Sequence, residues 1–142
     1  GVKKAIADRI APPPVLAELK QIGLADQVLD GDGKVRRALL SIEENNGTTL
    51  NLGLELALRY LKTRNIYASD LPNHQIKIGK ALLTPFHSND GGYVRADAGG
   101  YQILLNFHGT QKQFQVISIQ DVLKNQIPAD LIRNRIVLIG AT

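Results

Sequence analysis

The chain has 142 residues, of which 44% are hydrophobic and 21% are charged, and its formal net charge is +4. This ordinary apolar content and small net charge exclude a disordered chain, and no apolar run reaches the ~18 residues of a membrane-spanning helix. Because cysteine is absent, disulfides, thiolate zinc sites and cysteine nucleophiles are excluded as well. We therefore expect a single globular domain over residues 1–142.

The excess of basic residues does not indicate a nucleic-acid partner. The densest basic group, Lys34 with Arg36 and Arg37, follows directly on Asp30 and Asp32. Nucleic-acid-binding surfaces combine a stripe of positive charge with stacking aromatic residues, and this chain has only four Tyr and three Phe. We expect no nucleic acid as a partner.

Two short helices are expected at the start of the chain. Apolar residues recur at helical spacing over Val2–Ile10, and Pro12–Pro14 end this helix. The chain begins with Gly rather than Met, so we interpret residues 1–11 as the residual helix of a missing upstream element, in a domain truncated at its N-terminus. Pro14 and Gly23 then frame a second helix over Val15–Ile22.

A hairpin and a long helix follow. Ala25–Leu29 and Val35–Ile42 have strand-like patterns, and Asp30–Gly33 between them has the composition of a tight turn. After a further turn at Asn45–Gly47, apolar residues repeat at i, i+3, i+4 and i+7 over Leu50–Lys62. This pattern predicts a long helix that covers the sheet, with Thr48 or Thr49 as its N-cap.

The second half of the chain predicts short strands and short helices. Strand candidates are His74–Ile78, Ala81–Leu83, Tyr93–Arg95 and Tyr101–Phe107. Ser118 is expected to cap a helix over Ile119–Lys124, and Pro128 to open a helical turn through Ile132. The apolar run of Arg135–Ile139 predicts a strand buried on both faces, as in parallel sheets.

These elements predict an α/β fold, with α+β as the alternative: a mixed β-sheet with one long covering helix and several short helices. We find no internal repeat and no linker that would divide the chain.

No catalytic or metal-binding pattern is complete. Asp30–Lys34 is similar to the start of a calcium loop, but Lys34, Val35 and Ser41 stand where an EF-hand needs an oxygen ligand, glycine and glutamate. The histidines are not at metal-ligand spacing: they are His74, His87 and His108. We expect no catalytic residue, no metal and no cofactor in this chain.

Polar residues at turns and strand ends are the candidates for ligand binding, because loops on a rigid sheet usually carry such contacts. The candidates are Asp30, Asp32, Arg36, Arg95, Asp97, Asn106 and His108. They can also serve only to cap turns and solvate sheet edges.

The order of several motifs resembles the CHASE2 family of sensory domains. Asp30–Arg37 is similar to the family's D-x-D-G-x-V-R hairpin, and the leucine-rich helix Leu50–Leu61 follows it. Ile103–Gly109 matches a strand that ends in Asn-aromatic-x-Gly. The family closes with Ser-x-x-Asp-Val-Leu, Ile-Pro and I-V-L-I-G-A-T, which here are Ser118–Leu123, Ile127–Pro128 and Ile136–Thr142.

This resemblance implies an extracytoplasmic, periplasmic sensor domain of bacterial, often cyanobacterial, transmembrane receptors. Family members normally begin with a hundred or more further residues, so the resemblance implies the C-terminal portion of the domain. It further implies a membrane tether in the full-length protein and a cytoplasmic output such as a histidine kinase, a Ser/Thr kinase, an adenylate cyclase or a diguanylate cyclase. The expected partner is an unidentified small molecule or environmental signal, and a homodimer is compatible with this reading.

Two alternatives stay open. Ile136–Gly140 is similar to a strand that runs into the glycine turn of a dinucleotide-binding enzyme, although one glycine after an apolar strand is a weak signal. A dimerisation module without a ligand is the second alternative.

Overall fold

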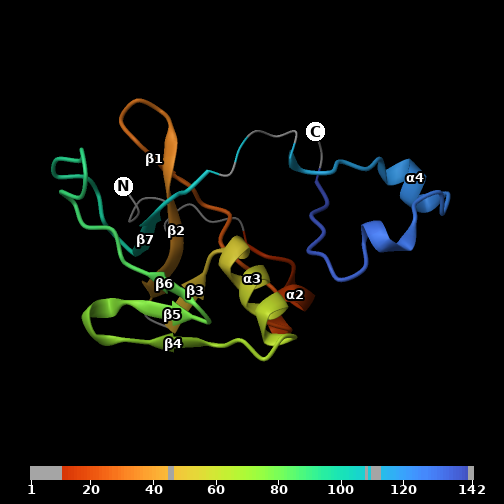
Figure 1. Ribbon diagram of the computed structural model, residues 1–142, viewed down its shortest axis with the longest axis horizontal. Coiled ribbons are helices and arrows are strands. Elements are labelled where there is room, and N and C mark those ends of the chain that lie inside the picture. Colours follow the sequence, from red (N-terminus) through yellow and green to blue (C-terminus); the bar gives the residue numbers. More distant parts are fainter. Residues whose placement is uncertain (1–10, 45–46, 108, 110–112, 141–142) are drawn as a thin grey trace. The chain divides into compact units, whose positions relative to one another are not determined.

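The structure is a computed structural model that describes residues 11–44, 47–107, 109 and 113–140 (Figure 1). The expected helix over Val2–Ile10 lies outside the described residues, as do Asn45 and Asn46 of the expected turn. The chain divides into two compact units, residues 1–105 and 106–142. Each unit is described by itself.

The main sheet of the first unit is built around one long strand. This strand, β2 (Val35–Glu44), pairs antiparallel with β1 (Val28–Leu29), β3 (Gly47–Leu50) and β7 (Tyr101–Leu104). The expected hairpin is confirmed, because β1 and β2 flank a turn at Asp30–Gly33, but β1 is shorter than the expected strand Ala25–Leu29. The strand β2 is two residues longer than expected, and β7 ends before the expected Phe107.

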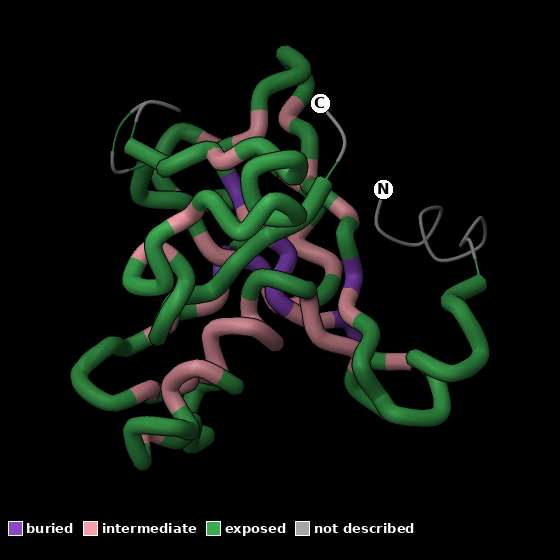
Figure 2. Tube along the Cα trace, turned by 90° about the vertical axis from the view of Figure 1, so that its right-hand side faces the viewer, coloured by how far each residue is buried: buried purple, intermediate pink, exposed green. Residues whose placement is uncertain are grey.

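Much of the core lies on β2, where Leu39, Leu40 and Ile42 are buried; Figure 2 draws the buried residues in purple. Leu39 and Ile42 are buried with Leu24, and Val28 packs against this cluster. Side chains alternate between the two faces of a strand, yet the neighbours Leu39 and Leu40 are both buried. The pairing of β2 with β7 shifts its register between Leu39 and Ser41, and such a bulge interrupts the alternation.

The helix α3 (Leu52–Lys62) begins later than expected. Thr48 and Thr49 are not its cap, because both residues pair with β2 as part of β3. Asn51 is the N-cap instead, and its side-chain oxygen accepts a hydrogen bond from the Gly53 amide at 2.8 Å. The expectation of a long covering helix is not confirmed, since α3 has eleven residues and none of them is buried.

The first helix described, α2 (Pro14–Glu18), is shorter than the expected Val15–Ile22. Pro14 does lie in its first turn. The helix ends because Lys20 takes a positive φ of 52°, which no α-helical residue adopts. The C-terminal limit at Gly23 was therefore wrong.

A second sheet consists of three short antiparallel strands, β4 (Ala68–Asp70), β5 (Ile76–Ile78) and β6 (Ala81–Leu83). The two expected strands β5 and β6 are confirmed, although His74 lies in the 3-10 turn η1 (Pro72–His74) before β5. The strand β4 was not expected, because its residues Ala-Ser-Asp have little strand propensity; all three are exposed.

The expected strand at Tyr93–Arg95 is wrong. This segment lies in a loop of turns, where the Tyr93 amide donates to the Asp90 carbonyl and the Arg95 amide donates to Asn89 Oδ1. Arg95 has a φ of 53°, which is incompatible with an extended strand.

Short helical segments occur among the described residues of the second unit. Ser118 caps α4 (Ile119–Leu123) through a hydrogen bond from the Gln120 amide, as expected, and η3 (Ala129–Leu131) follows Pro128. The expected strand Arg135–Ile139 is wrong: this segment has no strand pairing, and Ile139 is 85% exposed. A strand exists only where a neighbour supplies its hydrogen bonds, and no strand occurs among the described residues of this unit.

The expected α/β or α+β class is confirmed by sheets and helices in one chain, and every pairing within the two sheets is antiparallel. In the described part of the chain, none of the helices combines the length and the apolar character required to span a membrane.

Candidate functional site

The turn between β1 and β2 brings three of the candidate residues together. Its shape is fixed by a hydrogen bond from the Gly33 amide to the Asp30 carbonyl at 2.8 Å, with Gly33 at a φ of 75°. Arg36 reaches back over this turn and binds Asp32 in a bidentate pair, with distances of 2.9 and 2.8 Å. It also donates to Asp30 Oδ2 at 3.0 Å.

The neighbouring residue Arg37 points to the opposite face of β2 and is buried, with 4% of its surface exposed. Its Nε and Nη2 donate to Asp30 Oδ1 at 3.0 and 2.8 Å. Its Nη1 donates to the Asp97 carbonyl at 2.7 Å and to Gln102 Oε1 at 2.9 Å. Four of the five guanidinium N–H groups are therefore engaged.

Two aromatic rings enclose the same guanidinium. The Arg37 Cζ atom lies 4.9 Å from the ring centroid of Phe86 and 5.1 Å from that of Tyr93, within the range of cation–π attraction. The two rings pack edge to face with centroids 5.0 Å apart. The Tyr93 hydroxyl donates to Asp30 Oδ2 at 2.9 Å, so the loop before β7 is tied to the hairpin turn.

Gln102 connects the far side of this cluster to β7. Its side chain is fully buried, and its Nε2 donates to the Gly99 carbonyl at 2.7 Å and to the Asp97 carbonyl at 3.1 Å. No buried side-chain nitrogen or oxygen among the described residues lacks a partner. Such a satisfied network fixes one arrangement of the loop, since a buried polar group without a partner is costly.

The charges in the cluster hold both turn carboxylates ionised. Hydrogen bonds from the Arg36 guanidinium and from the Lys34 amide lower the pKa of Asp32 to about 2. Burial acts to raise the pKa of Asp30, but the hydrogen bonds from Arg36, Tyr93 and Arg37 outweigh it and place that pKa below its ordinary value. Burial and the bond to Asp30 raise the pKa of the Tyr93 hydroxyl.

A cavity of about 590 Å³ opens beside this cluster. Its polar lining residues are Asp26, Gln27, Asp30, Arg37, Tyr93 and Asp97, and its other lining residues are Val28, Leu29, Gly31, Leu39, Val94 and Ala96. A volume of this size, with apolar side chains and converging polar groups in one wall, lies in the range of small-molecule sites.

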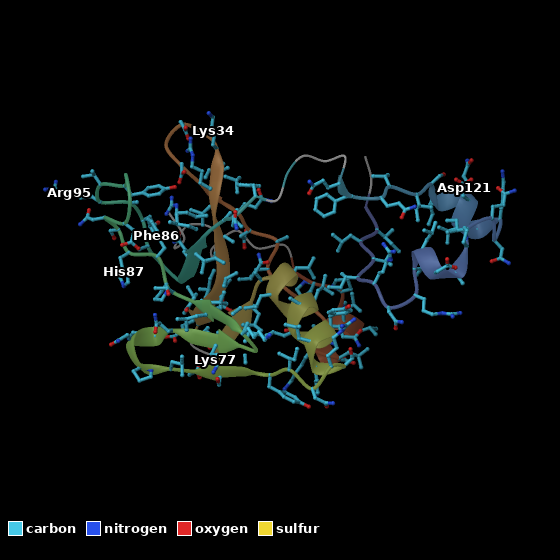
Figure 3. The ribbon with its side chains drawn as sticks, in the orientation of Figure 1. Lys34, Lys77, Phe86, His87, Arg95 and Asp121 are labelled. Atoms are coloured by element: carbon cyan, nitrogen blue, oxygen red, sulfur yellow. The ribbon has the colours of Figure 1, made fainter. Side chains whose placement is uncertain are left out.

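The structure gathers only some of the expected site residues. Asp30, Asp32 and Arg36 form the turn cluster, and Asp97 joins it through its backbone carbonyl, while its Oδ1 accepts from the Gly99 amide. The side chain of Arg95 lies on the outside of its loop, as do Lys34 at the hairpin tip and His87 (Figure 3).

The remaining two candidates are Asn106 and His108. Asn106 belongs to the second unit, and His108 lies outside the described residues. No group of three or more potential metal-ligating side chains occurs within the described ranges. At Gly140 the strand that would lead into a dinucleotide-binding turn is not formed.

Sequence reasoning missed the residues at the centre of the cluster, which are Arg37, Tyr93, Phe86 and Gln102. The alternation along β2 offered one signal, because Arg37 shares its strand parity with Leu39 and should face the core beside it. The other three residues come from segments 49 to 65 positions away along the chain, and only the fold brings them together.

One comparison with known proteins identifies the family. The family model described as the CHASE2 domain matches residues 2–142. No curated protein and no solved structure matches the chain. The match covers the hairpin, the site residues and the C-terminal motifs that carried the resemblance, and the chain therefore belongs to the CHASE2 family of extracellular sensory domains.

Proposed function

We propose that this chain is the extracytoplasmic signal-input domain of a transmembrane receptor whose cytoplasmic output is a kinase or a nucleotide cyclase. CHASE2 domains are sensory and not themselves catalytic, so the output reaction belongs to another part of such a receptor. A periplasmic location and a membrane tether in the full-length protein are parts of the same proposal, as is a homodimeric receptor.

The observation that carries the proposal is the position of Asp30 beside the cavity. This one carboxylate binds Arg36 and Arg37 of β2 and also the hydroxyl of Tyr93, 63 residues away along the chain. A molecule in the cavity touches both the hairpin and the 93–97 loop, because both line it. Ligand occupancy can therefore favour one arrangement of these segments over another, which is how a sensor shifts a population.

The proposal is tested by obstructing the cavity in the full-length receptor. Val94 lines the cavity and is 81% exposed, so Val94→Trp narrows the cavity without overpacking the core. The matched control is Val116→Trp, at a residue of the second unit that is 76% exposed. The measurement is the amount of phosphorylated or cyclised product in cells grown under several media.

We expect Val94→Trp to change the basal output or its response to the medium, whereas Val116→Trp leaves both unchanged. A receptor that keeps the same regulated output after Val94→Trp, and also after deletion of the whole domain, contradicts the proposal.

A further inference from the structure

The charged residues of the turn cluster beside the cavity neutralise one another. Asp30 and Asp32 balance Arg36 and Arg37 through the ion pairs of the turn cluster. Each oxygen of Asp30 already accepts two hydrogen bonds, and Arg37 has four of its N–H groups engaged. Of these side chains, Asp30 and Arg37 line the cavity, and they offer few free donors to a ligand.

Asp26 differs from the other acids of the lining. It precedes β1, faces the same cavity, and is only partly exposed. It makes no hydrogen bond or ion pair with any residue that the structure describes. A carboxylate with neither an internal counter-ion nor a structural role in its loop is available to a ligand.

The charges of the lining residues determine whether the cavity favours a cationic or an anionic ligand. Once the two aspartates and two arginines of the turn are paired, Asp26 remains as the acid of the cavity lining that has no partner among the described residues. A carboxylate or phosphate ligand would face this negative charge with at most one guanidinium N–H to receive it. A cation would gain attraction from the same charge.

The rest of the wall is suited to an apolar group. Val28, Leu29 and Val94 line the cavity, and Leu29 and Val94 are 62% and 81% exposed. Burial of such side chains against a hydrocarbon body is favourable because apolar surface leaves water. The cavity of about 590 Å³ accommodates a compact organic molecule.

We infer that the cavity binds a small organic cation, an amine or quaternary ammonium with a compact apolar body, and that Asp26 is its counter-ion. The ammonium group lies at the Asp26 carboxylate, and the apolar body contacts Val28, Leu29 and Val94. This inference rests on the proposed function in that the cavity is taken as the input site. It adds the chemical class of the signal.

The test is a calorimetric titration of the 142-residue chain at pH 7 with three probes of similar shape. These are 2-phenylethylamine, which is cationic, 2-phenylethanol, which is neutral, and phenylacetate, which is anionic. Each probe is titrated into the natural chain, into Asp26→Asn and into the matched control Asp70→Asn, which removes an exposed acid of β4 outside the cavity lining.

We expect the amine alone to show saturable binding to the natural chain and to Asp70→Asn, with an affinity that falls as salt is added. Asp26→Asn should weaken the amine about tenfold, as the loss of a charge-assisted hydrogen bond does. If the unfolding temperature of Asp26→Asn equals that of the natural chain, the loss of amine affinity comes from the missing carboxylate and not from a destabilised fold. Equal binding of all three probes, preferred binding of phenylacetate, no amine binding, or undiminished amine binding by Asp26→Asn overturns the inference.

The two proposals fail in different ways. If the amine does not bind but Val94→Trp alters the output of the receptor, the ligand class is wrong and the input role stands. If the amine binds through Asp26 but the receptor output is unchanged by Val94→Trp and by deletion of the domain, the input role is wrong.

Discussion

The Arg37 guanidinium and the Gln102 side-chain amide meet inside the sheet, with Nη1 and Oε1 2.9 Å apart, and both residues are buried. They hold the strands β2 and β7 and the loop before β7 in one arrangement, in a place where apolar residues usually form the contact. The stability of the site therefore depends on a polar network that has no solvent to replace a lost partner.

Arg37→Ala should destabilise the domain strongly. It leaves the Asp30 carboxylate, whose side chain is 8% exposed, without its buried partner, and breaking a buried pair costs about 3–5 kcal/mol. Arg36→Ala is the matched control, because its side chain is 45% exposed and such a surface pair contributes about 0–1 kcal/mol. Urea unfolding followed by circular dichroism measures both; similar losses for the two variants would contradict the central role of Arg37.

Acid should unfold the domain over the range in which Asp30 and Asp32 become protonated. Both carboxyls have folded-state pKa values below the ordinary 3.8, and that of Asp32 is about 2. A lowered pKa stabilises the folded state at pH values above 3.8, and this stabilisation is lost as the pH falls toward 2. We expect the unfolding temperature to fall between pH 4 and pH 2, and to fall less steeply in Asp32→Asn, measured by thermal denaturation at each pH.

The same pH series contains its own control. At pH 2 the natural chain and Asp32→Asn should have more similar stabilities than at pH 7. Protonation of the Asp32 carboxylate in the natural chain then removes much of the stabilisation that its ion pair with Arg36 provides at pH 7. A constant difference across the series would show that the carboxylate of Asp32 does not contribute through its charge.

Gly100→Ala should be far more destabilising than Gly91→Ala. Both glycines have a positive φ, at 70° and 57°, so each substitution bears the cost of about 1–2 kcal/mol for a left-handed residue. At Gly100 a Cβ would also lie 2.6 Å from Leu39 Cδ1 and 2.8 Å from the Ser41 carbonyl, whereas at Gly91 nothing lies within 4 Å. We expect an additional loss of about 1–3 kcal/mol for Gly100→Ala, measured by chemical denaturation; equal losses would be inconsistent with this packing.

Asn51→Ala should weaken α3, whereas Thr48→Ala should not. The Asn51 side chain accepts from the Gly53 amide at 2.8 Å, and loss of an N-cap costs about 1 kcal/mol. Thr48 is an exposed residue of β3 opposite Glu43, so its replacement should change the free energy of unfolding by less than about 0.5 kcal/mol. Asn51→Asp is expected to retain most of the stability, since aspartate is an equally good cap. A larger loss of stability in Thr48→Ala than in Asn51→Ala would instead indicate that Thr48 is the N-cap of α3, as the sequence predicted.

Local patterns in the sequence were sufficient for the elements whose signals are themselves local. The turn of Asp30–Gly33 and the Ser118 cap of α4 depend on residues within a few positions, and both were predicted. The ordered motifs also led to the CHASE2 family, which the family comparison confirms. Asp30, Asp32 and Arg36 were among the predicted candidates, because they lie in the turn or at the start of the strand that follows it.

Other features depended on partners that are distant in the sequence. The short strand β4 forms because β5 supplies its hydrogen bonds, and the apolar run Arg135–Ile139 remains unpaired because strand propensity alone supplies none.

The site shows the same division between sequence and tertiary structure. By itself the sequence determined the acidic turn with its adjacent arginines, since charge and turn chemistry are properties of neighbouring residues. Only the tertiary structure decided that Arg37 is buried between Phe86 and Tyr93 and that Gln102 receives its hydrogen bond. It also decided that Asp26 faces the cavity without a partner among the residues that the structure describes. Burial and contact between residues dozens of positions apart are set by how strands pair and loops close, and no short-range pattern encodes that geometry.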